Sequence, residues 1–164
     1  MDFSVEDAAA WSAAVFGSVD LGDKRLTKRL IQIGKQLSSL PGCSLSASCE
    51  GQEVLLEGSY RFLRNKRISA THIANGGYQV TSLLSQSIPT LLVIEDTTTL
   101  SYSHQVKEVL GDLGGHKEKS SRGFHVHTTL LMDAENEKTI GLIAQNRWCR
   151  AVEERGKKVH RRVR

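Results

Sequence analysis

The sequence predicts an α+β protein, with a small helical N-terminal domain over residues 1–70 followed by about three antiparallel strands within residues 71–164. Before residue 70, apolar residues recur at helical spacing. After it come three runs rich in apolar and β-branched residues, at 90–94, 124–132 and 139–143. No long helical pattern separates these runs, so we expect them to pair as an antiparallel meander.

The helical domain is predicted from local start and stop signals. A first helix should begin at Ser4, which has N-cap chemistry with Asp7 three residues on, and end at Gly17. A second should begin after Asp23 and stop at the Leu40-Pro-Gly sequence. We expect two further helices at about 52–64 and 70–87.

The second helix has two different faces. Its apolar residues fall on one arc, and a separate arc carries Lys24, Arg25, Lys28, Arg29 and Lys35. Five cations and no acid between residues 24 and 36 favour contact with nucleic-acid phosphates. An ordinary solvated helix face is the alternative.

An acidic pair follows the first predicted strand. Because Glu95 and Asp96 come directly after the apolar run 90–94, we expect them at the end of a strand. Asp96 is then a candidate Mg²⁺ ligand, while the alternative is that both carboxylates cap the next turn. Asp133 and Glu135 lie in a polar segment that reads as a solvated turn.

Three histidines are weaker candidates. His125 and His127 alternate on one face of a predicted strand, which suits either metal binding or ordinary packing and hydrogen bonding. His104 lies in a polar loop where it could contact substrate.

Charge and hydropathy limit the function classes. The net charge is +4, and residues 150–164 hold seven Lys and Arg against two Glu, which reads as a basic tail. No apolar stretch is long enough to span a membrane, and the acidic N-terminus does not resemble a signal peptide. We therefore expect a cytoplasmic, nucleoid-associated protein without a membrane partner.

Five segments run in a specific order: LGDKRLTKRL, SASCEGQEVLLEGSYRFLRN, LLVIEDTTTLSYSHQV, SRGFHVHTTLL and GLIAQNRWCR. Together they resemble the N-terminal part of a bacterial cut-and-paste DDE transposase of the insertion-sequence-four (Tn-five-like) family. The resemblance implies a helical domain that reads the transposon end. It also implies a ribonuclease H-like domain whose three acidic residues hold two Mg²⁺ or Mn²⁺ ions, and a dimerisation region after it.

The resemblance assigns roles to individual residues. Asp96 matches the first catalytic aspartate and is expected to be a catalytic metal ligand. Arg25, Arg29 and Arg61 match positions used for contact with the end sequence, and Ser46 and Glu53 fall in the same recognition region. Lys24, Lys28 and Arg64 are further expected DNA contacts, which the basic pattern of the helices predicts.

Two of the family's acidic motifs do not occur in the chain. We therefore expect a truncated, catalytically incomplete form with an incomplete metal site. Its expected partners are double-stranded DNA of the transposon terminus and a full-length transposase in a homo- or heterodimer. The alternatives are a non-functional pseudogene product, or an active transposase whose missing acids come from further sequence.

Overall fold

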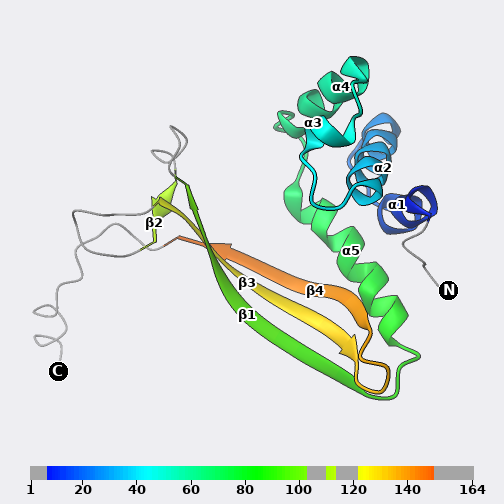
Figure 1. Ribbon diagram of the computed structural model, residues 1–164, viewed down its shortest axis with the longest axis vertical. Coiled ribbons are helices and arrows are strands. Elements are labelled where there is room, and N and C mark those ends of the chain that lie inside the picture. The colour runs from blue at the N-terminus through cyan, green and yellow to red at the C-terminus, as the bar shows by residue number, and fades with distance from the viewer. Residues whose placement is uncertain (1–6, 103–109, 114–121, 150–164) are drawn as a thin grey trace, which may run out of the picture. The chain divides into compact units, whose positions relative to one another are not determined.

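The computed structural model describes residues 7–102, 110–113 and 122–149. It confirms the predicted α+β class (Figure 1). The described elements are α1 (Ala8–Phe16), α2 (Lys24–Ser39), α3 (Leu45–Ser48), α4 (Glu53–Leu63), α5 (Ala70–Ser85), β1 (Leu91–Tyr102), β2 (Gly111–Asp112), β3 (Arg122–Asp133) and β4 (Thr139–Trp148).

Side-chain caps set where the helices begin. Asp23 caps α2 by accepting a hydrogen bond from the Arg25 amide, as predicted. Asp7 caps α1, accepting from the amides of residues 9 and 10, whereas Ser4 lies outside the described residues. The short helix α3, capped by Ser44, was not predicted.

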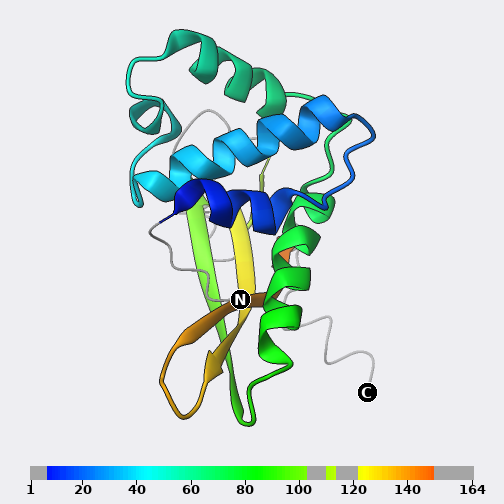
Figure 2. The same cartoon turned by 90° about the vertical axis from the view of Figure 1, so that its right-hand side faces the viewer.

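A closed apolar core joins the helices. It consists of Val19, Leu21, Leu30, Ile33 and Phe62, each at most 9% exposed. Helix α2 contributes two of these side chains and lies between α1 and α4 (Figures 1 and 2). Where α1 meets α2, the buried Ser12 hydroxyl donates to the Ile31 carbonyl at 2.7 Å, and Gly34 leaves room for that contact.

The sheet has β3 paired with β1, β2 and β4. Hydrogen bonds between side chains show that β1 runs antiparallel to β3: Glu95 faces Thr129, whereas Thr99 faces His125. Strands β3 and β4 form a hairpin in which the Asp133 amide donates to the Lys138 carbonyl at 2.9 Å. Strand β2 is antiparallel to β3, with Gly111 opposite Gly123.

One predicted boundary is wrong. Strand β1 does not end at the acidic pair but continues to Tyr102, so Glu95 and Asp96 lie in mid-strand. The run Thr97-Thr98-Thr99 explains the extension, because β-branched residues favour extended backbone and two of these threonines contact β3.

The contacts group the chain into two compact units. Of the described residues, one unit contains 7–92 with Leu131–Ile143, and the other contains 93–102, 110–113, 122–130 and 144–149. Among the helices of the described ranges, none has the length and apolar character to cross a membrane.

Candidate nucleic-acid interface and acidic site

Arg25 stands at the exposed start of α2. Its guanidinium contacts the Asp23 carboxylate, with 2.8 Å between Nη2 and Oδ2. The hydrogen bond from Arg25 lowers the pKa of Asp23, and the same bond raises the pKa of Arg25. The Arg25 side chain is 90% exposed, so water and salt weaken this pair and a ligand phosphate could compete for the guanidinium.

Arg29 lies one turn further along α2 in a different setting. It is half-buried, and its Nη1 donates to Oε1 of Gln32 at 2.8 Å. Its guanidinium lies against Gly58 of α4, where a β-carbon would come within 2.8 Å of the Arg29 Cζ. Arg29 is thus an expected DNA contact on α2 whose guanidinium also lies against a second helix, α4.

An open groove of about 670 Å³ lies beside this arginine. It is lined by Arg29 and Gln32 of α2 and by residues 51–55, which include Glu53 at the start of α4. The groove therefore combines guanidinium and amide donors with a carboxylate acceptor. This is the polar character that contact with base edges requires.

The cations of α4 are occupied locally. Arg61 pairs with Glu57 one turn earlier, at 2.6 Å between Nη2 and Oε1, and both side chains are exposed. The Arg64 guanidinium lies over the Tyr60 ring, 5.8 Å from its centre. Each contact joins residues one turn apart within α4 or its C-cap, Arg64, and leaves the cation at the surface.

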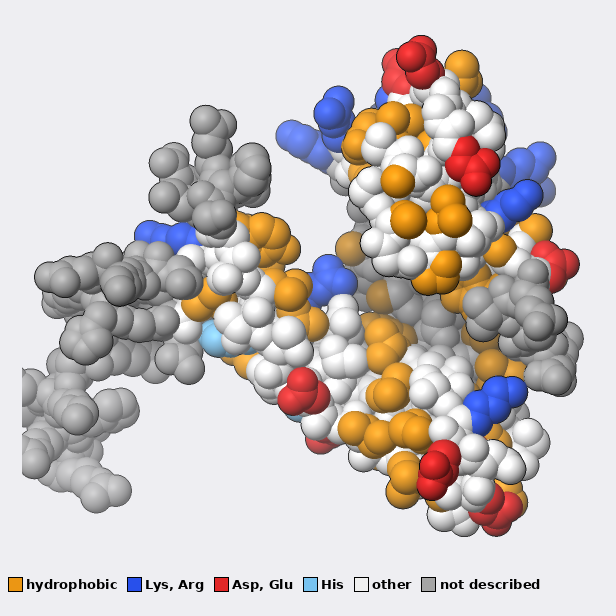
Figure 3. All heavy atoms as spheres, viewed as in Figure 1, with side chains coloured by type: hydrophobic (Ala, Val, Ile, Leu, Met, Phe, Trp, Pro, Cys, Tyr) orange, Lys and Arg blue, Asp and Glu red, His pale blue; other side chains and the backbone are white. Residues whose placement is uncertain are grey.

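The structure thus gathers some of the expected DNA contacts and not others. Arg29 and Glu53 line the same groove. Lys24 and Lys28 are exposed on α2, and Ser46 is exposed on α3 without lining that groove. Lys and Arg side chains project from the edges of the helical region in the view of Figure 3.

Asp96 is exposed on β1, where it accepts a hydrogen bond from Thr98 at 3.3 Å. Its neighbour Glu95 accepts from Thr129 at 3.2 Å. Successive strand residues point to opposite faces, so the two carboxylates do not act as a pair. This corrects the expectation that they lie together at the end of a strand.

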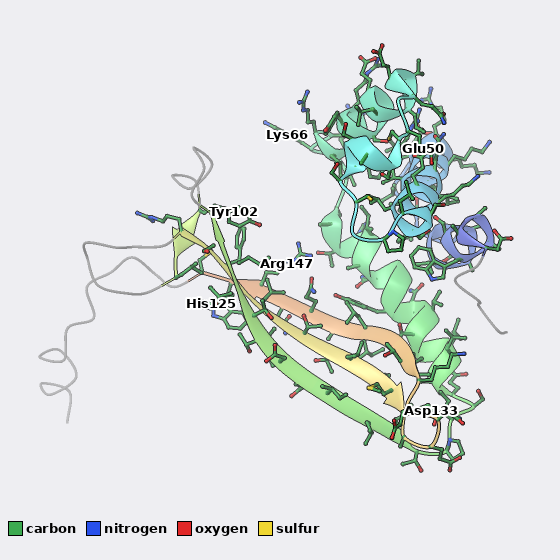
Figure 4. The ribbon with its side chains drawn as sticks, in the orientation of Figure 1. Glu50, Lys66, Tyr102, His125, Asp133 and Arg147 are labelled. Atoms are coloured by element: carbon green, nitrogen blue, oxygen red, sulfur yellow. The ribbon has the colours of Figure 1, made fainter. Side chains whose placement is uncertain are left out.

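The histidines of β3 share the Glu95 face. The Thr97 hydroxyl lies 2.8 Å from Nδ1 of His127, and the Thr99 hydroxyl lies 3.3 Å from Nδ1 of His125. The His125 ring also lies against Trp148, with 5.5 Å between ring centres. Figure 4 labels His125 on this part of β3. Both rings are thus hydrogen-bonded within the sheet, while His104 lies outside the described residues, as does the basic tail 150–164.

The acidic residues do not fit a two-ion centre as they stand. Over residues 7–102, 110–113 and 122–149, no three His, Cys, Asp or Glu side chains converge to hold a metal ion. Asp96 alone cannot clamp two ions, so no catalytic step follows from this set.

Asp133 forms the β3–β4 turn (Figure 4). Its carboxylate accepts hydrogen bonds from the Asn136 side chain at 2.7 Å and from the Glu135 amide at 2.9 Å. The Asn136 bond, followed by the Glu135 amide, lowers the pKa of Asp133. The prediction of a polar turn is confirmed.

Two residues that contact Arg29, Gln32 and Gly58, are not among the site residues that the sequence predicts. A glycine inside a helical pattern is itself a signal, because it usually has a packing or functional reason. Its partner, however, lies on another helix, 29 positions away in sequence.

Comparison with known protein families gives one finding for this region. Residues 8–68 match the family model described as transposase DNA-binding. The matched segment begins with α1 and ends just before α5, so it contains the groove and every expected DNA contact. Helices α1–α4 therefore form a transposase DNA-binding domain.

Proposed function

We propose that the transposase DNA-binding domain of this chain binds the terminal sequence of a transposon as duplex DNA, through α2 and the start of α4. The family match over residues 8–68 carries the proposal. The groove beside Arg29 supports it, because Arg29 and Glu53 are both DNA contacts that the resemblance leads us to expect, and both line this groove.

The groove also suggests which residues contact DNA phosphates and which contact base edges. Lys24 and Lys28 are exposed, flexible cations suited to phosphates, which hold a protein on DNA without reading its sequence. Arg29 donates to Gln32 and lines the groove with the Glu53 carboxylate, and this combination of donor and acceptor suits a base edge. We therefore assign affinity mainly to the exposed lysines and sequence preference mainly to Arg29.

Binding is tested with a duplex that the chain selects from a randomised pool. Arg29→Ala should weaken binding to the selected duplex by about 1–3 kcal/mol and relax the preference over a scrambled duplex. Arg147→Ala is the matched control, since it removes the same charge from β4, outside the matched segment. Equal losses in both variants would point to general charge attraction and count against the proposal.

We further propose that the 164-residue chain does not cleave DNA by itself, because it carries one of the three acidic motifs of the family it resembles. Incubation with Mg²⁺ and the selected duplex should leave the DNA intact. A nicked product that disappears in Asp96→Asn would contradict this proposal.

A chain that occupies transposon ends without cutting them would compete with an intact transposase. Added to a reaction of a full-length relative on shared ends, it should lower the yield of cleaved product. The Arg29→Ala variant should lower that yield less. Equal inhibition by both chains would exclude competition for the ends and leave pairing with the enzyme itself as the cause.

A further inference from the structure

The arginines expected to contact DNA differ in their own partners. Arg25 is paired with the Asp23 carboxylate and Arg61 with the Glu57 carboxylate. Arg29 instead donates to the amide of Gln32, which is neutral. Its positive charge is therefore not compensated by this hydrogen-bond partner. Among the residues that the structure describes, only one of the five guanidinium N–H donors is used, which leaves four for other acceptors.

The position of the Arg29 guanidinium depends on two neighbours. Gln32 lies three residues along α2 and fixes one end of the group through the 2.8 Å bond to Nη1. Gly58 of α4 supplies the surface beneath it, because a β-carbon there would lie 2.8 Å from Cζ and 2.9 Å from both terminal nitrogens. Any larger residue at 58 must therefore push the guanidinium away.

We propose that Gln32 and Gly58 are positioning residues that hold Arg29 in the orientation it needs to recognise a base in the groove. This inference rests on the proposed DNA-binding function. It assigns Gly58 a role in sequence preference that acts through the space it leaves, and Gln32 a role that acts through one hydrogen bond.

Gly58→Ala separates this role from a structural one. Alanine is the better helix former, so the substitution should not lower the melting temperature of the chain. The obstructed atoms are the far end of a flexible arginine, which can move without disturbing the core. Recognition and stability should therefore change in different directions.

The control is Gly77→Ala on α5. Both glycines lie inside a helix, but a β-carbon at 77 meets nothing within 4 Å. Gly77→Ala should match the wild type in its dissociation constants for the selected and the scrambled duplex. Gly58→Ala should bind the selected duplex about ten-fold more weakly, while binding to the scrambled duplex changes little.

A double-mutant cycle tests whether Gly58 and Gln32 affect DNA recognition through Arg29. If Gly58 acts through Arg29, then adding Gly58→Ala to Arg29→Ala should produce no further loss. Gln32→Ala should weaken selective binding in the wild type and also have no effect in the Arg29→Ala background. Gln32→Glu should weaken binding as well, because a carboxylate would neutralise the arginine.

The outcomes separate the inference from the function on which it rests. A wild-type chain that does not prefer its selected duplex over the scrambled one overturns both. If Arg29→Ala loses selectivity but Gly58→Ala keeps it, only the positioning role is overturned. A Gly58→Ala loss that persists undiminished in the Arg29→Ala background likewise overturns the positioning role.

Discussion

The apolar side chains of the helical domain and of strand β1 differ in their exposure to solvent. In the helices, the core side chains Leu30, Ile33 and Phe62 are 4–6% exposed. On β1, Leu92, Val93 and Ile94 are 43–61% exposed. The helical domain therefore stabilises itself through its own core, whereas β1 depends mainly on pairing with β3.

This difference in exposure follows from the number of apolar faces that each element must bury. The apolar arc of α2 is narrow, and packing against its neighbouring helices buries Leu30 and Ile33 at its centre. In a continuous apolar run of a strand, successive side chains point to opposite faces of the sheet. Hydrogen bonding to the neighbouring strand lies in the plane of the sheet and therefore covers neither face. The apolar run 92–94 on β1 is such a case.

The largest expected effect comes from the same substitution made in both regions. Leu30→Ala should destabilise the chain by about 2–5 kcal/mol, because it removes buried methyl groups and leaves a cavity. Leu92→Ala should have a clearly smaller effect, of about 1 kcal/mol or less, since Leu92 is already 47% exposed. Thermal unfolding followed by circular dichroism measures both changes. Similar losses in the two variants would mean that β1 is as well packed as the helical core.

A smaller effect tests how tightly α1 and α2 pack. Gly34→Ala would place a methyl group against the Ser12 hydroxyl and 2.7 Å from Phe16 Cε2. We expect a loss of about 1–3 kcal/mol, despite the higher helix propensity of alanine.

Gly77→Ala provides the comparison for the same measurement. With open space around it, this substitution should stabilise α5 by about 0.5–1 kcal/mol. If Gly34→Ala were also stabilising, the two helices could separate without cost and the close contact would not limit the sequence.

The smallest effect concerns the β3–β4 turn and depends on pH. Its hydrogen bonds lower the pKa of Asp133 in the folded chain. The ionised carboxylate therefore stabilises the fold in full at pH values above 3.8, the ordinary pKa of an aspartate. That contribution is lost as the pH falls through the lowered pKa.

Asp133→Asn keeps the shape of the side chain but removes its charge. The melting temperature of the wild type should exceed that of the variant at neutral pH, and the difference should shrink in acid. A difference that stays constant with pH would show that shape alone holds the turn. Other carboxylates are common to both chains and cancel in this comparison.

Sequence reasoning succeeded where the signal was local. The cap at Asp23 and the breaker after Ser39 set the bounds of α2 within one residue. The predicted end of β1 at the acidic pair is wrong, because Thr97 and Thr99 continue the pairing with β3. The strand extends because partner residues about 30 positions away complete it, and no local pattern contains that information.

The sequence by itself predicted α1, α2, α4 and α5, the basic face of α2 and the resemblance that points to Arg29 and Asp96. Only the tertiary structure brought Gly58 of α4 against the Arg29 guanidinium, whereas Arg25 contacts Asp23, its neighbour in sequence. It also placed Glu95 and Asp96 on opposite faces of one strand. Residue type and helical spacing act over a few positions, whereas the surroundings of a charge depend on which distant elements pack against it.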